Sequence, residues 1–530
     1  MPASWIVGVV LALLACHVLK KLLIDLRPQR ALPPGPRKLP LVGNITDMPP
    51  AGGQDWLHWA KHKDLYGPIS SVTVLGQPIV IINDLKIAVE LLNRRSAIHS
   101  SRPNMIFASE MVGWESSLAM QGSTDRFRAY RKAIQPSFGS ESGVSQFNAV
   151  QEKEVRRFLL RILRKPDEFL EHILTEAGAV ILSAAYGYTI EPFERDNLVH
   201  MSNVALDRFA QAATPGKWMV DLIPMLRYIP TWFPGAQFKR TAKAWRNQIS
   251  SLADVPYAFS KAQVKNGTSK PSYLASFFSA HGIPEPGTEA EAVAKWTAAS
   301  LYAGGADTTV SSIECFILAM ALYPEVQAKA QEEIERVVGP KSLSTLADRS
   351  RLPYLNAVVK EVLRWHPVAP MALPHMSVKD DTWENFFLPK GSLILANIWA
   401  MMHDPATYHD PMTFKPERFL PSEGHTPETD PHTIAFGFGR RICPGRFLAD
   451  STVFLTVAQT LAVFDIRNAV QDGVPASNPP KFQAGMVSQP VPFQCSIKVR
   501  SPSHEALVLS VEQEHPWEPS DAPAVKNLNY

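Results

Sequence analysis

Cysteine is scarce in this sequence, with four residues in 530. Cys16, Cys315, Cys443 and Cys495 are widely separated and form no C-x-x-C pair. The sequence therefore suggests neither a zinc site nor a disulfide framework, because both need cysteines at characteristic spacings. This sparse usage fits a protein of a reducing compartment.

An excess of charge of either sign is also missing. The chain has 53 Lys and Arg residues against 50 Asp and Glu, a formal net charge of +3, which gives no reason to expect a nucleic acid as partner. The sequence contains no internal repeats and nothing like a fused flavin domain. Apart from the loop at residues 436–445, described below, it contains no cofactor motif. Proline is abundant instead, with 45 residues spread along the whole chain. The length permits several domains, and only the order of the functional motifs argues for one large unit.

The N-terminal segment is apolar. Residues 5–19 contain no charged side chain. This run is short for a membrane span, because a spanning helix needs about 20 apolar residues. Residues 22–24 must therefore extend the span, and the side chains of Lys20 and Lys21 must snorkel towards the membrane surface. No Lys or Arg precedes the apolar run, which disfavours a cleaved signal peptide. The positive charges that follow the span place the C-terminal side in the cytosol. We expect a signal-anchor helix over residues 1–26 and a cytosolic body; a cleaved signal peptide is the alternative.

The expected membrane topology bears on two further features. Residues 220–235 form an apolar segment punctuated by proline and carrying Trp232 and Phe233, and aromatic residues of this kind favour the membrane interface. This loop is expected either to dip into the bilayer or to pack in the core. The glycosylation sequons at Asn44 and Asn266 become chance matches, because glycosylation requires lumenal exposure.

Prolines and β-branched runs organise the start of the body. The run Pro33–Pro36 cannot continue a helix, which predicts a stiff hinge. Short β-branched runs at 69–75 and 78–82 predict a hairpin, and helical patterns fill most of the remaining chain. We therefore expect a mainly α protein with small β-sheets, of the α+β class. The expected boundaries are 1–26 for the anchor, 27–44 for the hinge, 45–510 for the catalytic domain and 511–530 for a loose polar tail.

The chemistry centres on residues 436–445, with the sequence Phe-Gly-Phe-Gly-Arg-Arg-Ile-Cys-Pro-Gly. The glycines let the loop fold tightly and press against a flat ligand. Cys443 lies beside Arg441 and just before a predicted helix, a positive environment that favours the thiolate. A lone thiolate in such a cradle suits an axial position of a haem iron, where it favours O–O cleavage. The alternative is a buried cysteine in a glycine-rich turn.

Five residues of this loop carry a resemblance. Phe436, Gly439, Arg441, Cys443 and Gly445 resemble the cysteine-ligand loop of the cytochrome P-450 family, the haem-thiolate monooxygenases. The resemblance implies that the protein has the cytochrome P-450 fold. It also implies a haem b group (iron protoporphyrin IX) with Cys443 as the axial ligand of its iron and with the other loop residues beside the haem.

A long helical pattern over residues 294–322 is interrupted by Gly304 and Gly305. Each glycine weakens a helix by about 1 kcal/mol, and a kink would free backbone carbonyls and make room for a small molecule. The following Asp307 and Thr308 resemble the oxygen-binding motif of the family. The resemblance implies that Thr308 hydrogen-bonds to bound dioxygen and that Asp307 supplies protons through water. The alternative is a helix cap, for which Asp-Thr-Thr is also common.

Glu361 and Arg364 are three residues apart on one predicted helix and so lie on one face. Such a pair is usually a surface ion pair of little energetic value. Residues 416–419, Pro-Glu-Arg-Phe, follow in the order that the family requires. The resemblance implies a buried cluster of Glu361, Arg364 and Arg418 with a structural role.

Other residues are assigned by the resemblance alone. Arg131 and His375 would bind the haem propionates; a solvated basic face and an ordinary core or surface histidine are the alternatives. The family usually has Trp where Phe127 stands, and a phenyl ring cannot donate a hydrogen bond, so Phe127 itself cannot make that propionate contact; whether this alters haem binding stays open. Residues expected to line the substrate cavity are Val368, Ala369, Met371 and Met486.

The resemblance covers nearly the whole chain after the anchor and implies the partners. Electrons would come from NADPH through a separate membrane-bound flavoprotein reductase, with dioxygen as co-substrate. The protein is expected to be a monomer in the endoplasmic reticulum membrane, spanning it once. Basic residues that would form part of the reductase docking face are Lys132, Arg440, Arg441 and Arg446.

The implied function is oxidation, typically hydroxylation, of an apolar small molecule. The sequence is similar to fungal members of secondary metabolism of the O-methylsterigmatocystin oxidoreductase type, which points to a polyketide, terpenoid or alkaloid. One alternative is a membrane-tethered haem protein without turnover. Another is a family member that catalyses a rearrangement without a reductase, against which the intact pair Asp307 and Thr308 argues.

Overall fold

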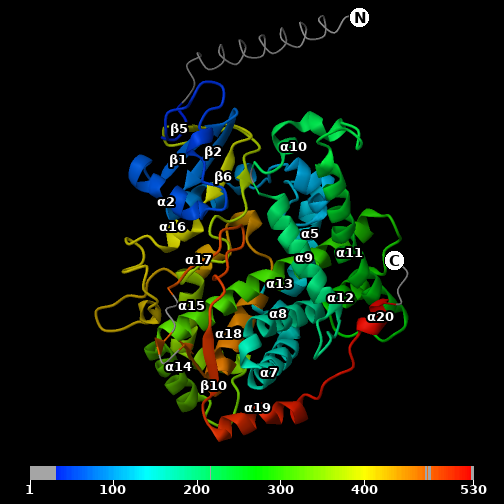
Figure 1. Cartoon of the computed structure of the whole chain (residues 1–530), viewed down its shortest axis with the longest axis vertical. Helices are drawn as coiled ribbons and strands as arrows, with labels where there is room; N and C mark the ends of the chain where they lie inside the picture. The colour runs from blue at the N-terminus through cyan, green and yellow to red at the C-terminus, as the bar shows by residue number, and fades with distance from the viewer. Residues whose placement is uncertain (1–30, 215, 472–473, 476–478, 527–530) are drawn as a thin grey trace, which may run out of the picture. The chain divides into compact units, whose positions relative to one another are not determined.

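The computed structural model describes residues 31–214, 216–471, 474–475 and 479–526. The predicted anchor over residues 1–26 lies outside the described residues. The described chain is mainly helical with small β-sheets (Figure 1), as predicted. Its internal contacts divide it into two compact units. Of the described residues, the smaller unit contains 31–103, Met371–Met401 and Phe438–Arg441; the larger contains those of 104–370, those of Met402–Gly437 and those after 441.

The smaller unit is built on a four-stranded sheet with the order β1-β2-β6-β3. The strands β1 and β2 form the predicted antiparallel hairpin, β2 pairs with β6 in parallel, and β3 pairs with β6 in antiparallel register. Leu75 and Gly76, which join β1 to β2, both have positive φ angles, as the tightest hairpin turns require. The strands of this unit are β1 (Ile69–Val74), β2 (Gln77–Ile82), β3 (His375–Met376), β4 (Asp381–Trp383), β5 (Phe386–Leu388) and β6 (Leu393–Ala396).

Short helices and one asparagine complete the smaller unit. Asn44 is buried; its Oδ1 accepts from the Thr73 N–H at 2.9 Å, and its Nδ2 donates to the Pro36 carbonyl at 3.2 Å. This asparagine joins the hinge to β1, so its amide is not open to glycosylation in the folded protein. The helices are η1 (Ile45–Asp47), α2 (Asp55–Tyr66), α3 (Leu85–Ala88), η2 (Val89–Arg94), α4 (Ser96–His99), η10 (Gly439–Arg441) and α16 (Ile398–Met402), whose last residue belongs to the larger unit.

The larger unit is organised around α13 (Glu289–Leu322). This helix packs against α8, α5, α9, α11, α15 and α18 (Figure 1). It is long and apolar enough to cross a membrane, but most of its apolar stretch is buried inside the unit, as in the core helix of a globular protein. The other main helices are α5 (Asp125–Phe138), α7 (Asn148–Arg164), α8 (Phe169–Tyr186), α9 (Asn197–Ala212), α11 (Gln237–Lys265), α12 (Tyr273–His281), α14 (Pro324–Val337), α15 (Pro353–Trp365), α18 (Arg446–Val463) and α19 (Pro502–Glu514).

Shorter elements connect these helices. The strand β7 (Phe464–Asn468) pairs with β10 (Cys495–Val499), and β8 (Val470–Gln471) pairs with β9 (Val474–Pro475). The short helices are η3 (Ile106–Met111), η4 (Trp114–Ser116), α6 (Glu141–Val144), η5 (Ser145–Phe147), η6 (Pro166–Glu168), α10 (Met219–Leu222), η7 (Pro224–Tyr228), η8 (Leu346–Arg351), η9 (Pro416–Phe419), α17 (His432–Ala435) and α20 (Ala522–Lys526).

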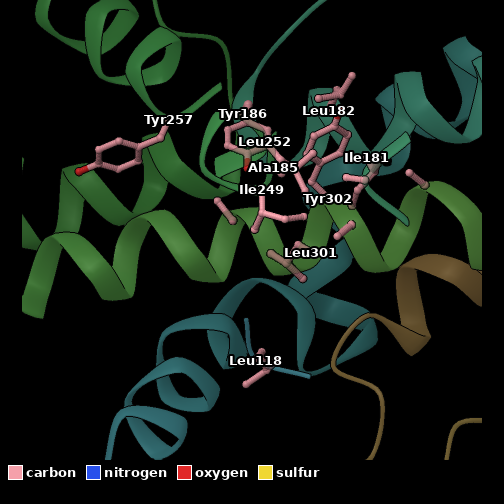
Figure 2. Close-up of a cluster of buried hydrophobic side chains, with 14 of the residues drawn as sticks. Leu118, Ile181, Leu182, Ala185, Tyr186, Ile249, Leu252, Tyr257, Leu301 and Tyr302 are labelled. Carbon is pink, nitrogen blue, oxygen red and sulfur yellow. The ribbon is translucent and has the colours of Figure 1, made fainter. Parts of the chain in front are cut away.

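The core beside α13 is a continuous apolar cluster (Figure 2). The side chains labelled in the figure come from α8, α11, α13 and the segment between η4 and α5. Full burial of one such aliphatic or aromatic side chain is worth about 1.5–3 kcal/mol. The residues labelled in Figure 2 are Leu118, Ile181, Leu182, Ala185, Tyr186, Ile249, Leu252, Tyr257, Leu301 and Tyr302.

The C-terminal segment differs from the sequence prediction. Residues 511–526 are not a loose tail, because they pack against the larger unit. The Arg157 guanidinium lies over the Trp517 ring at 5.0 Å, Lys153 pairs with Glu518 at 2.7 Å, and Ala522 is buried. The polar composition that suggested disorder instead serves ion pairs and a cation–π contact.

The two central glycines of α13 also differ from the prediction. The helix runs unbroken through Gly304 and Gly305. A Cβ atom on Gly305 would lie 2.9 Å from Ile181 Cγ1, whereas a Cβ on Gly304 would meet nothing within 4 Å. Gly305 therefore permits the close packing of α13 on α8.

This contrast gives a test with a matched control. Gly304→Ala should raise the free energy of unfolding by about 1 kcal/mol, the difference in helix propensity between the two residues. Gly305→Ala should lose that gain, because Ile181 must shift to admit the methyl group. Equal midpoints of thermal unfolding for the two variants would contradict this account.

Candidate functional site

The cysteine loop closes through a backbone hydrogen bond. The Cys443 N–H donates to the Phe436 carbonyl at 2.9 Å, and the Gly437 N–H donates to the Ile434 carbonyl at 3.1 Å. Cys443 forms no disulfide, and α18 begins three residues later at Arg446. Cys443 is thus a free thiol shortly before the start of α18.

Opposing effects set the charge of this thiol. Burial raises the pKa of Cys443, whereas a hydrogen bond from the Gly445 backbone and the charges of Arg131 and Arg446 lower it. Burial is the largest effect, which corrects the expectation that the positive surroundings alone favour the thiolate. A metal ion in place of the proton would hold the sulfur as thiolate, because a coordinating thiol is deprotonated.

The helix α5 supplies a cation to the same loop. Arg131 Nη1 donates to the Ile442 carbonyl at 2.8 Å. Burial lowers the pKa of Arg131, and the nearby Cys443 opposes that shift. Phe127, one turn earlier on α5, is buried in the apolar core. The phenyl ring at this position therefore contributes packing, and Arg131 is the charged group that α5 brings to the loop.

The part of the loop in the smaller unit has no room for a side chain at Gly439. This residue has a φ of 54°, and a Cβ atom would lie 2.1 Å from the Leu92 carbonyl oxygen. Its N–H donates to the Asn93 side chain. The predicted need for glycine thus has two causes here, the left-handed backbone conformation and the close approach of η2.

Two arginines of the smaller unit lie close together. Arg441 Nε donates to the Ser100 carbonyl at 2.6 Å. Arg102 Nη1 donates to the Leu373 and Pro374 carbonyls, both at 2.7 Å. Burial and the charge of Arg441 lower the pKa of Arg102 to about 9. Sequence reasoning missed Arg102, because its partners lie some 270 residues away in the chain.

His375 belongs to the same group. Its Nδ1 lies 2.8 Å from the His99 carbonyl, so Nδ1 carries a proton. Burial and then the charge of Arg102 lower the pKa of His375 to about 3. The charges of Arg102 and Arg441 repel each other and disfavour protonation of His375. An anionic ligand at this place would relieve that repulsion.

The acid–threonine pair lies on α13. Thr308 Oγ1 donates to the Gly304 carbonyl at 2.6 Å, and Gln489 Nε2 donates to Asp307 Oδ1 at 2.7 Å. Burial raises the pKa of Asp307, and the bond from Gln489 opposes that shift. Seven residues further along, burial and the charge of Asp307 raise the pKa of Glu314 to about 8.

Two of the segments predicted to line the substrate cavity are adjacent. The Ser488 N–H donates to the Val368 carbonyl at 2.9 Å, which places the turn containing Met486 beside the extended segment after α15. Val368, Ala369 and Met486, all in the larger unit, are half-buried. Met371 is also half-buried and belongs to the smaller unit.

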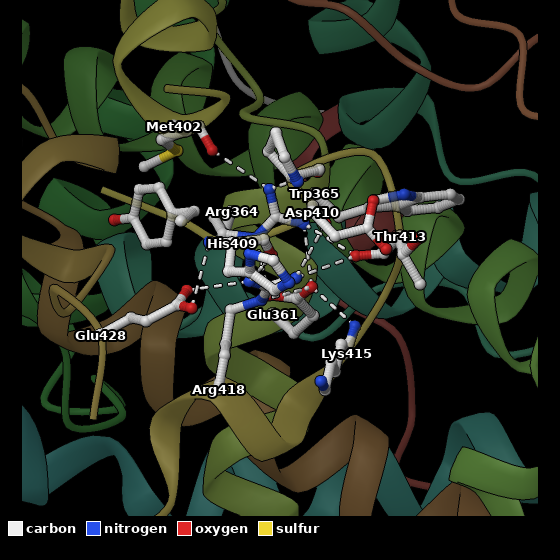
Figure 3. A network of polar contacts seen from close by, with 12 residues as sticks. Glu361, Arg364, Trp365, Met402, His409, Asp410, Thr413, Lys415, Arg418 and Glu428 are labelled. Carbon is white, nitrogen blue, oxygen red and sulfur yellow. Dashed lines mark hydrogen bonds and ion pairs between the residues drawn. The ribbon is translucent and has the colours of Figure 1, made fainter. Parts of the chain in front are cut away.

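The structure brings Glu361, Arg364 and Arg418 together in a buried network (Figure 3). Arg364 binds Glu361 through two bonds, Nε to Oε2 at 2.7 Å and Nη2 to Oε1 at 2.8 Å. Arg418 Nε donates to Glu361 Oε1 at 3.2 Å, and its Nη1 donates to Glu428 Oε2 at 2.8 Å. Glu428, which sequence reasoning missed, balances the second arginine.

The network also fixes the backbone between α16 and η9. Arg364 Nη1 donates to the carbonyls of Met402 at 3.1 Å and Pro411 at 2.8 Å. The Lys415 N–H donates to Glu361 Oε1 at 2.7 Å. The ion pairs therefore hold an irregular segment of the larger unit against α15.

With this geometry, the comparison with known families is decisive. A family model described as cytochrome P-450 matches residues 33–497 of the chain. The chain belongs to the cytochrome P-450 family.

Fungal relatives agree over almost the full length. The chain is 47% identical over 525 residues to the cytochrome P-450 monooxygenase ppsD of Aspergillus oryzae, covering 99% of each protein. It is 46% identical to claR of Ampulloclitocybe clavipes, covering 93% of this chain and 91% of that one. It is 45% identical to O-methylsterigmatocystin oxidoreductase of Aspergillus flavus, covering 96% of each. The protein is a cytochrome P-450 monooxygenase, as the cysteine loop predicted.

Cytochrome P-450 membership implies a haem, and each of the two units, taken by itself, carries groups of the kind that a haem needs. The larger unit offers the free thiol of Cys443 with Arg131 beside it. The smaller unit offers the guanidinium groups of Arg102 and Arg441, which suit the carboxylates of a porphyrin, with His375 beside Arg102.

A histidine behind the cysteine loop of this cytochrome P-450 was not predicted. His432 lies between two carboxylates, with Nδ1 2.8 Å from Asp430 Oδ1 and Nε2 2.8 Å from Asp450 Oδ1. Its ring stacks on Phe436 with 6.0 Å between centroids, and Arg349 binds Asp450. Burial opposes the charged imidazolium, but the two carboxylates prevail and raise the pKa of His432 to about 9.

Loss of the Glu361 carboxylate should be severe. Glu361→Ala leaves two buried guanidinium groups short of a partner, which costs about 3–5 kcal/mol, so little haem-loaded protein should be recovered. The control is Glu417→Ala, which breaks the partly exposed pair with Lys329 and should cost about 1 kcal/mol or less. Equal haem content in the two purified variants would contradict the structural role.

His432 should make stability depend on alkaline pH. Its folded pKa of about 9 exceeds the ordinary value of 6.5, so its contribution is fully present below about pH 6.5 and is lost as the pH rises through 9. His432→Gln should therefore destabilise the protein at pH 6, by up to about 3 kcal/mol, and much less at pH 10. The midpoint of thermal unfolding measures both. A constant gap between variant and wild type across this range would refute the assignment.

Proposed function

We propose that this cytochrome P-450 monooxygenase oxidises an apolar small molecule of secondary metabolism, of the polyketide, terpenoid or alkaloid type. The observation that carries the proposal is that the larger unit contains both the free thiol of Cys443, three residues before α18, and an acid–threonine pair on α13. The similarity to an enzyme named for O-methylsterigmatocystin supports a substrate of that kind.

The cysteine loop and the basic groups would hold the haem b. Cys443 Sγ would ligate the iron, with Phe436 and Gly445 beside it in the loop. Bound haem supplies the activation of dioxygen. Arg131, Arg441 and His375 would bind the propionates, with Arg102 adding charge in the smaller unit. A propionate beside His375 would favour the imidazolium form, which can donate from both nitrogens.

The acid–threonine pair would deliver protons. Because burial raises the pKa of Asp307, its carboxyl takes up a proton more readily than an exposed aspartate does. The neighbouring Thr308 hydroxyl both donates and accepts hydrogen bonds, so it can pass a proton on. A positioned acid of this kind is worth about 10²–10⁴-fold in rate.

Substrate and partner complete the proposal. Val368, Ala369, Met371 and Met486 would contact the apolar substrate. Electrons from NADPH would arrive through a separate flavoprotein reductase, since the sequence carries no flavin motif. Residues proposed for reductase docking are Lys132, Arg440, Arg441 and Arg446.

We further propose that the protein is a monomer in the endoplasmic reticulum membrane and that the chain between α9 and α11 touches the bilayer. Trp232 is 78% exposed and Met225 is 70% exposed. Apolar side chains concentrated on a surface mark an interaction site, and amphipathic aromatics suit the membrane interface. The exposed apolar residues of this segment are Met219, Leu222, Ile223, Met225, Tyr228, Trp232 and Phe233.

Membrane contact can be tested with the N-terminal anchor removed. Trp232→Glu combined with Phe233→Glu should weaken binding to liposomes several-fold, because charge is expelled from the interface. A suitable control is Phe193→Glu, at an aromatic residue outside this segment that is 69% exposed. Binding that is unchanged in the double variant, or equally weakened in the control, would rule the contact out.

Proton delivery can be tested with the purified protein, its reductase and NADPH, using O-methylsterigmatocystin as the first substrate tried. Thr308→Ala should lower the ratio of product formed to NADPH consumed while NADPH oxidation continues. Thr309→Ala removes the same atoms from the next residue and should leave the ratio near wild type. An unchanged ratio in Thr308→Ala, or product formation without NADPH, would favour a rearrangement instead.

A further inference from the structure

A polar stripe runs along one face of the C-terminal half of α13, where Thr308, Thr309 and Ser312 are also polar. Asp307, Ser311 and Glu314 are four and three residues apart, so their side chains lie above one another on the helix. Their neighbours Val310 and Ile313 are fully buried. Polar groups inside an apolar core are retained where other polar groups satisfy them.

The segment 482–490 supplies such partners for Asp307 and Ser311. Gln489 Nε2 donates to Asp307 Oδ1 at 2.7 Å, and Ser311 Oγ donates to the Ser488 carbonyl at 2.7 Å. Two consecutive residues of the segment thus bind two successive turns of α13. Asp307 is therefore bonded to a part of the chain about 180 residues away.

The segment itself is held firmly. The Gln483 N–H donates to the Gln489 carbonyl at 2.8 Å, and the Ser488 N–H donates to the Val368 carbonyl at 2.9 Å. Ser488 Oγ donates to the Gln483 carbonyl at 2.7 Å. The backbone that carries the Gln489 amide is consequently fixed both within its own turn and against the chain that follows α15.

An amide differs from a cation as a partner for Asp307. A Lys or Arg would hold the carboxylate ionised, because an opposite charge strongly favours the charged form. A neutral amide orients the carboxylate through one hydrogen bond, and burial still raises the pKa of Asp307. The arrangement fixes the direction of the acid and leaves it able to gain and lose a proton.

We propose that Gln489 is a positioning residue, whose side-chain amide holds the Asp307 carboxylate in place on α13 from outside that helix. The proposal rests on the proposed function in giving Asp307 a role in proton delivery. It also makes the position of this acid depend on the turn that carries Met486, on the proposed substrate side.

The test is an infrared titration of the haem-loaded protein. The absorption of protonated carboxyl groups is followed against pH, and subtraction of an otherwise identical protein with Asp307→Asn isolates the signal of Asp307. Wild type is compared with Gln489→Leu, which removes the donor at similar volume, and with Gln489→Asn, whose amide is one methylene too short. The matched control is Gln483→Leu in the same turn, since its side chain bonds to the Pro490 carbonyl at 3.1 Å.

In Gln489→Leu and Gln489→Asn, the protonated Asp307 signal should persist to higher pH than in wild type, because the ionised carboxylate loses its donor. Gln483→Leu should titrate like wild type. The proposal is overturned if Gln489→Leu titrates like wild type, or if Gln483→Leu shifts equally. Thermal midpoints should be alike in the two Leu variants, since the Ser311–Ser488 bond remains in both. The infrared titration needs no catalytic turnover. A protein without NADPH-dependent oxidation would therefore contradict the proposed function, whereas the titration would still test the contact between Gln489 and Asp307.

Discussion

The burial of one thiol is the constraint on which the rest of the structure depends. Sulfur that is shielded from water resists ionisation, and burial is the dominant effect on the pKa of Cys443. The protein opposes it with a backbone N–H from Gly445 and with the cations Arg131 and Arg446. The closure of the loop by the Cys443–Phe436 bond points the sulfur in one direction, as a single axial ligand requires.

The larger unit buries ion pairs around Glu361 and His432, at places where apolar side chains could pack instead. Burying ions is expensive, and a hydrophobic replacement of a buried ion pair is often as stable or more so. The network around Glu361 instead binds four backbone groups, through Arg364 and directly, in an irregular stretch that side-chain packing alone would hold less uniquely. We interpret it as specifying geometry, and the ion pairs of His432 with Asp430 and Asp450 do the same beneath Phe436.

Local patterns in the sequence were enough to find the β1–β2 hairpin, the long helix α13, the cysteine loop and the three residues of the Glu361 cluster. Gln489, His432, Arg102 and Glu428 were missed. Gln489 and Arg102 bind partners that are distant in the chain. Glu428 binds Arg418, ten residues away, and His432 binds Asp430 and Asp450, which are two and 18 residues away. No spacing rule marks such pairs, because the turn that aligns them is defined only in three dimensions.

Three expectations failed for physical reasons that composition conceals. The polar C-terminal residues are ordered by a buried Arg157 lying over Trp517. Gly305 serves helix packing against Ile181 and does not interrupt α13. The thiol pKa is governed by burial more than by its cationic neighbours. In the first two cases the decisive contact comes from an element remote in sequence.

The central claim is that Cys443 is the thiolate ligand of a haem. The most direct measurement is the carbon monoxide difference spectrum of the reduced protein, recorded for wild type beside Cys443→Ser. The account predicts a strongly red-shifted Soret band that is lost in the variant. A band at the position typical of histidine ligation in wild type, or a red-shifted band that survives in Cys443→Ser, would contradict it.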